Sequence, residues 1–315
     1  MVLGIHHVTA ISGDAQQNVD FYVGVLGLRL VKQTVNFDDP TVYHLYYGDG
    51  IGRPGTLMTT FPYGHILPGK RGRGETASIT FEVPVGSLDF WVTRLAIETK
   101  TSGEDMIFGK RVIWAHDPDG LRIELEEVET STDFTFWKHS PVPAEYAIRA
   151  IRRVSLMPMR GRSIGDFATT EDTLTRKFNA EQTATEDGRT RFCLGVSEVD
   201  VIDAPNEPLA RSSAGTVHHV AFRIKNHEIH EQWLLELSRS GFHTSPIMER
   251  DYFRSIYFRE PGGVLFEFAT DQPGMMIDEP EETLGETLQV PQMHVHRREH
   301  LETVLPKLSI PGVTR

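Results

Sequence analysis

GIHHVTAISGDAQQNVDFYVGVLGLRL, at positions 4–30, contains a pattern that returns two-thirds of the way along the chain. The second copy is GTVHHVAFRIKNHEIHEQWLLELSRSGF, at 215–242. In each copy, a β-rich piece with two adjacent histidines leads into a helical pattern, and Gly27 or Gly241 closes the predicted helix. Self-similarity of this kind indicates a repeated structural unit.

A second recurring piece reads as a turn followed by a strand. DPDGLRIELEEV at 117–128 and EPGGVLFEFATD at 260–271 each open with a Pro-x-Gly turn and continue with alternating apolar and polar residues. Glu124 and Glu267 therefore occupy matching positions on matching strands. A third copy, RPGTLMTTFP at 53–62, has the turn and the strand but no carboxylate.

Four units of about 55 to 70 residues follow from these repeats. They start near Gly4, Thr76, Ala147 and Gly215, and each reads as a strand, a helix and three strands. The sequence thus predicts an α+β protein of four βαβββ modules in two domains, with a linker in KHSPVPAEY and a boundary near Pro143. The expected divisions are 1–143 with modules one and two, 144–272 with modules three and four, and a tail at 273–315 with a short helix.

Composition narrows the function classes. The 315 residues are 39% hydrophobic, as in an ordinary globular protein of two domains, and the net charge of −12 would repel a phosphate backbone. Nucleic acid is not an expected partner. No signal peptide and no apolar run of roughly 18 residues stands out, so we expect a cytoplasmic protein that does not contact a membrane. Cys193 is the single cysteine, which excludes an intrachain disulfide and a thiolate cluster, so any metal must be held by His, Asp or Glu.

The repeats select the candidate metal ligands. Only the first and fourth units carry a histidine on the opening strand, and only the second and fourth carry a glutamate on the closing strand. If the first and fourth units pair, His7, His219 and Glu267 converge, and Glu124 is left as a salt-bridged structural residue. Two histidines and one carboxylate with open positions are typical of non-haem iron(II) oxygenases.

Each histidine pair raises a question of direction. Adjacent strand residues point to opposite faces, so only one member of a pair can face the metal. We assign the second member because its distance to the following turn is equal in both copies, from His7 to Asp14 and from His219 to Asn226. Strict alternation would then turn His6 and His218 away, unless strand twist brings them round.

A rival motif lies in the tail. Residues 296–300 fit H-x-x-E-H, the inverted zinc-protease signature, with both histidines on one helix face. Only 15 residues follow His300, which leaves little room for the remaining ligand on a later helix. We therefore expect a surface helix here.

The chain resembles the vicinal oxygen chelate superfamily, which contains glyoxalase I, extradiol dioxygenases and bleomycin-resistance proteins. The segments GIHHVTAISGD, DPDGLRIELEE and EPGGVLFEF carry the resemblance, which runs from Gly4 to about Ala269. LVKQTVNFDDPTVYHLYYGDGIGRPGTLMTTFP, at 30–62, is more specific. It resembles the subgroup of hydroquinone 1,2-dioxygenases and ring-cleaving dioxygenases of quinone resistance.

This resemblance implies an iron(II)- and dioxygen-dependent, extradiol-type enzyme that opens hydroquinone-type aromatic rings. Its partners would be a small aromatic substrate and O2, and a homo-oligomer is compatible with it. The residues that match the subgroup are the metal ligands His7, His219 and Glu267, the catalytic residues Tyr257, His218 and Arg250, and the substrate-binding residues Thr9 and His6.

Two alternatives stay open. A glyoxalase-like metal-dependent isomerase or lyase would need a fourth protein ligand near Met58 or Thr59, where the sequence has no carboxylate. A metal-free protein that binds an aromatic toxin would not need the three ligand positions, which are intact here.

Overall fold

All four predicted units are present in the structure, a computed structural model that describes residues 1–129 and 133–313. Each unit has an opening strand, a helical segment and three further strands. The repeats in the sequence therefore predicted the order of elements correctly.

Units one and four contain the two histidine pairs. Unit one consists of β1 (Val2–Ser12), α1 (Ala15–Val19) continued by the π-helical segment η1 (Asp20–Val25), β2 (Arg29–Val35), β3 (Tyr43–Gly48) and β4 (Leu57–Pro62). Unit four consists of β13 (Thr216–Ile224), α4 (His227–Arg239), β14 (Met248–Glu249), β15 (Arg254–Arg259) and β16 (Leu265–Thr270).

Units two and three have the same order of elements. Unit two consists of β5 (Glu75–Pro84), α2 (Leu88–Glu98), β6 (Ser102–Ile107), β7 (Lys110–His116) and β8 (Arg122–Val128). Unit three consists of β9 (Ala150–Met157), α3 (Thr170–Asp172) continued by η2 (Thr173–Lys177), β10 (Glu181–Glu186), β11 (Arg189–Leu194) and β12 (Ser197–Ile202).

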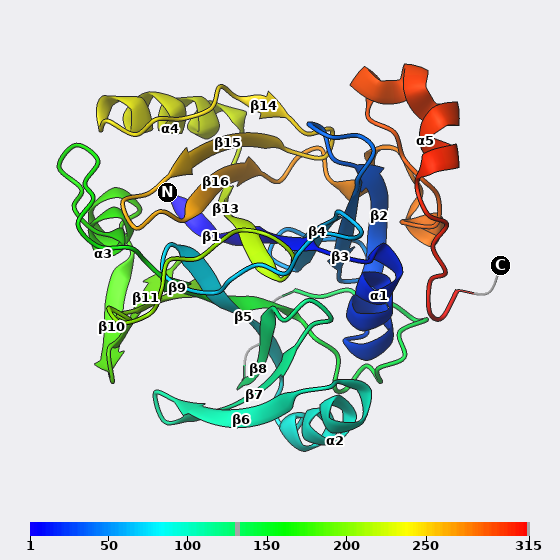
Figure 1. Ribbon diagram of the computed structural model, residues 1–315, viewed down its shortest axis with the longest axis horizontal. Helices are drawn as coiled ribbons and strands as arrows, with labels where there is room; N and C mark the ends of the chain where they lie inside the picture. The colour runs from blue at the N-terminus through cyan, green and yellow to red at the C-terminus, as the bar shows by residue number, and fades with distance from the viewer. Residues whose placement is uncertain (130–132, 314–315) are drawn as a thin grey trace.

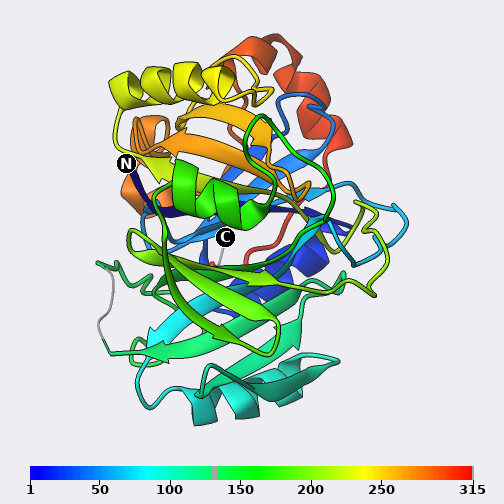
Figure 2. The same ribbon diagram turned by 90° about the vertical axis from the view of Figure 1, so that its left-hand side faces the viewer.

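The strands form two curled eight-stranded mixed sheets, which lie one above the other in Figures 1 and 2. The first sheet has the order β14-β15-β16-β13-β1-β4-β3-β2, and the second has the order β10-β11-β12-β9-β5-β8-β7-β6. Unit one thus pairs with unit four, as the ligand argument required, and unit two pairs with unit three. The domain boundary near Pro143 stays a prediction.

The two halves of the first sheet meet at β1 and β13, which run antiparallel. On the outer side of this pair, β4 runs parallel to β1 and β16 runs parallel to β13. The two units are therefore related by an approximate twofold axis between β1 and β13. The curled first sheet has a concave face, which is called the cup from here on. Residues at equivalent register positions of the two units face each other across this cup.

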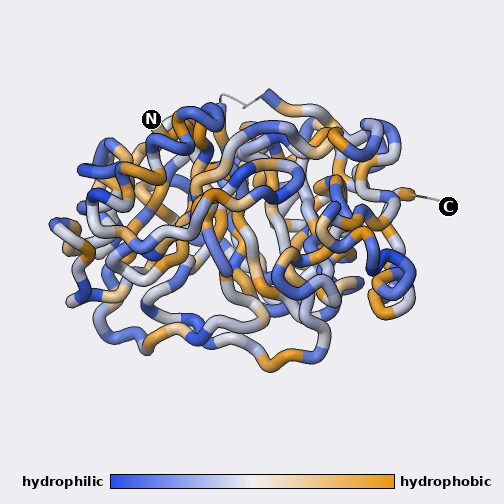
Figure 3. The backbone as a smooth tube through the Cα atoms, turned by 90° about the horizontal axis from the view of Figure 1, so that it is seen from above, coloured by the Kyte–Doolittle hydropathy of each residue, from blue (hydrophilic) through white to orange (hydrophobic). Residues whose placement is uncertain are grey.

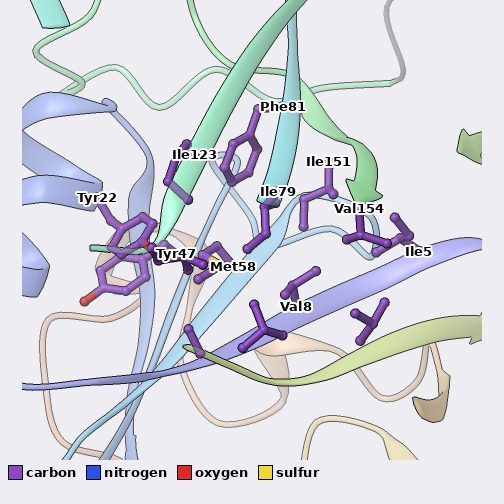
Figure 4. Packing of buried hydrophobic residues seen from close by; sticks show 14 of the residues in the cluster. Ile5, Val8, Tyr22, Tyr47, Met58, Ile79, Phe81, Ile123, Ile151 and Val154 are labelled. Atoms are coloured by element: carbon purple, nitrogen blue, oxygen red, sulfur yellow. The ribbon is translucent and has the colours of Figure 1, made fainter. Parts of the chain in front are cut away.

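The core fills the space between the two sheets. Figure 4 shows Ile5 and Val8 of β1 facing Ile79 of β5 and Val154 of β9, all of them buried. Figure 3 shows hydrophobic segments as short pieces interrupted by hydrophilic ones, which fits strands that bury one face against another layer. Because Val8 faces the core, its neighbours His7 and Thr9 point to the opposite face of the sheet, which forms the cup.

The tail crosses the free edge of β2. It contains η3 (Met275–Ile277), η4 (Glu281–Thr283), η5 (Gln292–Arg297) and α5 (Arg298–Val304), the last of which is the predicted short helix. Lys32 of β2 is completely buried and pairs with Asp278 and Glu279 of the tail. In residues 1–129 and 133–313, no helix has the length and apolar character needed to cross a membrane.

Candidate metal centre

Three side chains converge on one point in the cup of the first sheet. The Nε2 atoms of His7 and His219 are 3.2 Å apart. Glu267 Oε2 lies 2.9 Å from His219 Nε2 and 3.4 Å from His7 Nε2. Among the described residues, this is the one group of three His, Cys, Asp or Glu side chains whose ligand atoms lie close enough together to hold a metal ion.

The pairing of strands produces this convergence. Thr9 stands opposite His219 in the β1–β13 ladder, and Glu267 lies beside Ala221 on β16. Glu124 belongs to the second sheet, where Thr80 Oγ1 donates to one carboxylate oxygen at 2.7 Å and Arg122 Nε donates to the other at 2.8 Å. The expectation that Glu124 is a salt-bridged structural residue is confirmed.

A cation would complete this donor set. Glu267 is completely buried, and its Oε2 atom has no hydrogen-bond donor in suitable geometry among the described residues, whereas Oε1 accepts from Ser255 Oγ at 2.5 Å. A buried carboxylate oxygen without a partner is costly, and a bound cation removes that cost. Burial opposes ionisation of Glu267, but the imidazoles of His7 and His219 outweigh it and hold the pKa of this carboxyl well below its usual range. Burial lowers the pKa of His219, so its Nε2 lone pair is available to a metal.

β-Bulges place the first member of each histidine pair. Ile5 pairs with Phe222 and His7 pairs with Ala221, so His6 is an extra residue on β1. By the same reasoning, His218 is an extra residue on β13. A bulge bends the strand and redirects a side chain. Strict alternation, which turned these two histidines away from the centre, is therefore wrong at both positions.

The redirected histidines contact the candidate ligands. His6 Nδ1 lies 2.9 Å from His7 Nδ1, and His218 Nδ1 lies 2.7 Å from His219 Nδ1. A histidine that binds a metal through Nε2 keeps its proton on Nδ1, so each candidate ligand would donate a hydrogen bond to the histidine before it. Burial, then the charge of the neighbouring ligand histidine, lowers the pKa of His6 well below its usual range and that of His218 to about 3. Both residues would then be neutral acceptors that fix the rings of His7 and His219.

A cavity of about 230 Å³ opens onto the ligands from one side. Tyr257 and Arg250, both predicted site residues, lie on its wall together with His218. Arg250 Nε donates to the Tyr257 hydroxyl at 3.3 Å, and the Tyr257 ring packs edge-on against His219. Burial, then the charge of Glu267, raises the pKa of Tyr257 above its usual value, so the hydroxyl keeps its proton and can donate it to a ligand.

Thr9 and His6 lie behind this wall. Thr9 Oγ1 is 2.8 Å from His219 Nε2, and the His6 ring packs against Phe253 and His7. Neither residue is part of the cavity lining. The structure thus places them against the ligand imidazoles, and a direct contact with substrate stays a prediction.

Sequence reasoning missed part of the wall. His44 of β3, Phe61 at the end of β4 and Phe253 before β15 line the cavity. His44 has no repeat partner, because the equivalent position of unit four is Ser255. The one available signal was its period-2 alternation with Tyr46 on a predicted strand, which indicates a shared face but not a site.

The fourth-ligand position can be assigned from register. Thr59 lies beside Thr9 on β4 as Glu267 lies beside Ala221 on β16, so Thr59 is the twofold equivalent of Glu267. Of the two positions considered, Met58 is buried in the core between the sheets and Thr59 faces the centre. A hydroxyl thus stands where a four-ligand site would have a carboxylate.

The second sheet fills the corresponding place with an ion network. Arg153 and Asp200 occupy the register positions of His219 and Glu267. Arg153 is completely buried, with Nε 3.2 Å from Asp200 Oδ2 and NH1 2.7 Å from Glu126 Oε2. A guanidinium therefore neutralises these carboxylates.

Comparison with known proteins agrees with this architecture. The family model of the Glyoxalase/Bleomycin resistance protein/Dioxygenase superfamily matches residues 4–125 and 161–268. "Putative ring-cleaving dioxygenase MhqO" of Bacillus subtilis (strain 168) is 39% identical over 307 residues, which cover 96% of each chain. The chlorohydroquinone/hydroquinone 1,2-dioxygenase of Sphingobium indicum is 34% identical over 315 residues, again covering 96% of each chain.

Two solved structures extend the comparison. A crystal structure described as that of a "putative dioxygenase" from Bacillus subtilis superposes with a TM-score of 0.91 at 37% sequence identity and covers 98% of both chains. Glyoxalase I of Zea mays superposes with a TM-score of 0.60 at 11% identity and covers 85% of this chain and 92% of its own. The second likeness shows a shared fold alone.

Proposed function

Because this chain belongs to the Glyoxalase/Bleomycin resistance protein/Dioxygenase superfamily and is a ring-cleaving dioxygenase, we propose that it uses one iron(II), held by His7, His219 and Glu267, to open hydroquinone-type rings with O2. The observation that carries this proposal is the buried group of two imidazoles and one carboxylate at the bottom of a cavity.

The donor set favours iron. Imidazole and carboxylate ligands with open positions suit iron(II) in oxygenases, whereas a structural zinc site would be closed by a fourth protein ligand. When bound, iron(II) would supply the site that holds substrate and O2 together and exchanges electrons with them. His6 and His218 would fix the rings of His7 and His219 through their Nδ1 atoms.

The walls of the cavity suit a single aromatic ring. Phe61 and Phe253 offer apolar faces, and Tyr257 with Arg250 offers a donor pair beside the centre. We assign to the Tyr257 hydroxyl the role of donating to the reacting substrate oxygen, with Arg250 holding that hydroxyl in place. His218 accepts from His219 at Nδ1, so its own proton lies on Nε2, from which it can donate to a substrate oxygen in the cavity.

These wall residues lead us to infer that the two hydroxyls of the substrate are in the para arrangement. A catechol binds a metal through two adjacent oxygens, whereas a hydroquinone offers one oxygen and must gain its orientation from protein groups. Tyr257, Arg250 and His218 supply such groups. We infer that hydroquinones are the substrates and that Thr9 and His6 contribute to binding them.

The test is oxygen uptake by iron-loaded protein with matched para- and ortho-diols. Hydroquinones should be consumed with stoichiometric O2 and faster than catechols of equal size. Turnover of catechols alone would assign a conventional extradiol enzyme, and no uptake with either would favour the isomerase or the metal-free binding protein. The homo-oligomer and the cytoplasmic location stay predictions.

A residue of the C-terminal tail is expected to support the metal site from a distance. Asp278 accepts from Lys32 Nζ at 2.5 Å and from the Tyr252 hydroxyl at 2.9 Å, and Phe253 beside Tyr252 packs on His7. Asp278→Asn should keep iron but lower turnover, because the loss of its charge weakens the contacts that hold Tyr252 and Phe253 beside His7. Iron content and steady-state kinetics of the folded variant would check this.

The histidines of the H-x-x-E-H match provide the control on the same tail. His296 and His300 are exposed and lie outside the metal group. His296→Ala and His300→Ala should leave iron content unchanged and turnover within about 2-fold, as for surface substitutions. Abolished activity in either folded variant would show that the tail contributes to catalysis directly.

A further inference from the structure

Four polar side chains form a continuous hydrogen-bonded chain that starts at the candidate ligands. Thr9 Oγ1 lies 2.8 Å from His219 Nε2 and 2.7 Å from Thr59 Oγ1. Thr59 Oγ1 in turn lies 2.9 Å from His44 Nε2, and His44 Nδ1 lies 3.0 Å from the Tyr46 hydroxyl. The hydrogen-bonded chain therefore crosses from β1 through β4 to β3, and it ends at His44 and Tyr46, which are part of the cavity lining.

The approximate twofold axis places this hydrogen-bonded chain across the cup from Tyr257 and Glu267. Tyr46 lies beside Thr59 as Tyr257 lies beside Glu267. The cup thus has a tyrosine on each wall. One wall has a carboxylate next to its tyrosine, and the other has a hydroxyl there.

The surroundings of these four hydrogen-bonded side chains suit neutral groups that pass a proton on, and they disfavour groups that hold a charge. Thr9, Thr59 and Tyr46 are completely buried and His44 is nearly so, and the His44 ring lies between the rings of Tyr46 and Phe61. Burial, then the charge of His7, lowers the pKa of His44 well below its usual range, so this imidazole stays neutral. A neutral imidazole can still pass a proton by accepting at one nitrogen and donating from the other.

We propose that His44 is a positioning residue for ring cleavage, which takes up the proton of the substrate hydroxyl through Thr9 and Thr59 and releases one through Tyr46. This proposal rests on the function proposed above and adds a proton path to it. If His219 Nε2 held a cation, the Thr9 hydroxyl, which lies 2.8 Å from that nitrogen, would lose this partner and would be free to bond a substrate oxygen beside the cation.

The proton transfer balances along the chain. The substrate O–H bond breaks and its proton goes to Thr9, while the proton of Thr9 goes to Thr59 and that of Thr59 goes to His44 Nε2. His44 gives its Nδ1 proton to Tyr46, whose own proton passes to water in the cavity. His44 begins with its proton on Nδ1 and ends with it on Nε2, so no residue gains a net charge.

The hydrogen bonds present after the transfer stabilise the substrate phenolate. His44 Nε2 then donates to Thr59, Thr59 donates to Thr9, and Thr9 donates to the substrate phenolate. Hydrogen bonds to a charged oxygen are about twice as strong as those between neutral groups. A carboxylate at Thr59 would instead repel the phenolate, which explains why a hydroxyl suits this position.

The test compares substitutions along the chain with matched substitutions on the opposite face of the same strands. The relay variants are Thr59→Val, Tyr46→Phe and His44→Phe. The controls are Thr60→Val and Tyr47→Phe, whose hydroxyls bond Asn18 at 2.6 and 2.8 Å away from the centre. All variants would be loaded with iron(II) under anaerobic conditions and mixed with 4-nitrophenol, whose visible absorbance reports its ionisation.

At the pH at which the parent protein holds equal amounts of bound phenol and phenolate, each relay variant should lower the phenolate-to-phenol ratio by about 10-fold. Turnover should fall by about 10- to 100-fold with a reduced solvent deuterium isotope effect, and KM should change little. The two controls should match the parent in every measurement.

Two outcomes separate this proposal from the function on which it rests. If the parent consumes oxygen but the relay variants ionise the probe as the controls do, the relay is wrong and the ring-cleavage function stands. If the parent ionises the probe and the relay variants lower the ratio, but no diol supports oxygen uptake, the relay stands and the proposed substrates are wrong.

Discussion

His7→Ala, His219→Ala and Glu267→Ala are each expected to lose the bound iron and, with it, all measurable turnover. These side chains offer the three candidate ligand atoms, and substitution of a mere supporting partner already weakens metal binding by about 10- to 100-fold. Loss of a direct ligand should therefore exceed about 100-fold in affinity. Metal analysis after anaerobic loading and desalting, together with circular dichroism to verify folding, would measure this.

Glu124→Gln is the matched control for the ligand substitutions. Glu124 has the same position in unit two that Glu267 has in unit four, but its carboxylate bonds Thr80 and Arg122 in the other sheet. This variant should keep one iron per chain. Loss of iron from folded Glu124→Gln would contradict the assignment of the centre to units one and four.

Tyr257→Phe is expected to keep the iron and to lower turnover by roughly 10- to 1,000-fold, the range for loss of a positioned proton donor. The change deletes one hydroxyl, which bonds Arg250, and leaves the ring against His219 in place. Steady-state oxygen uptake by protein with a verified iron content would check it.

Tyr47→Phe supplies the comparison for Tyr257→Phe, because Tyr47 is completely buried, faces the core and bonds Asn18. It should retain turnover. Equal losses in the two variants would mean that Tyr257 acts through stability, and unchanged turnover in Tyr257→Phe would remove this hydroxyl from the chemistry.

The sequence repeats predicted most of the fold. Two copies of the His-His strand and helix, and two copies of the turn with a glutamate strand, predicted four units and the pairing of the first with the fourth. The convergence of His7, His219 and Glu267 followed from that pairing alone. These signals are local in sequence and recur, which makes them readable without a structure.

The missing parts depend on features that no repeat reports. The direction of His6 and His218 is set by two β-bulges, and a bulge has no sequence signature as strong as period-2 alternation. The role of His44 depends on its distance to Thr59, which comes from a neighbouring strand, and its twofold equivalent is Ser255. Such residues could be found only when strand register was known.

The most direct test of the iron-dependent ring cleavage is the fate of labelled dioxygen. Protein loaded with one iron(II) per chain would be given a hydroquinone under ¹⁸O₂, and the product would be examined by mass spectrometry. Ring cleavage by a dioxygenase should give a ring-opened product that carries both labelled atoms, and His219→Ala should give no such product. An unlabelled quinone, or oxygen uptake that continues in iron-free protein, would contradict it.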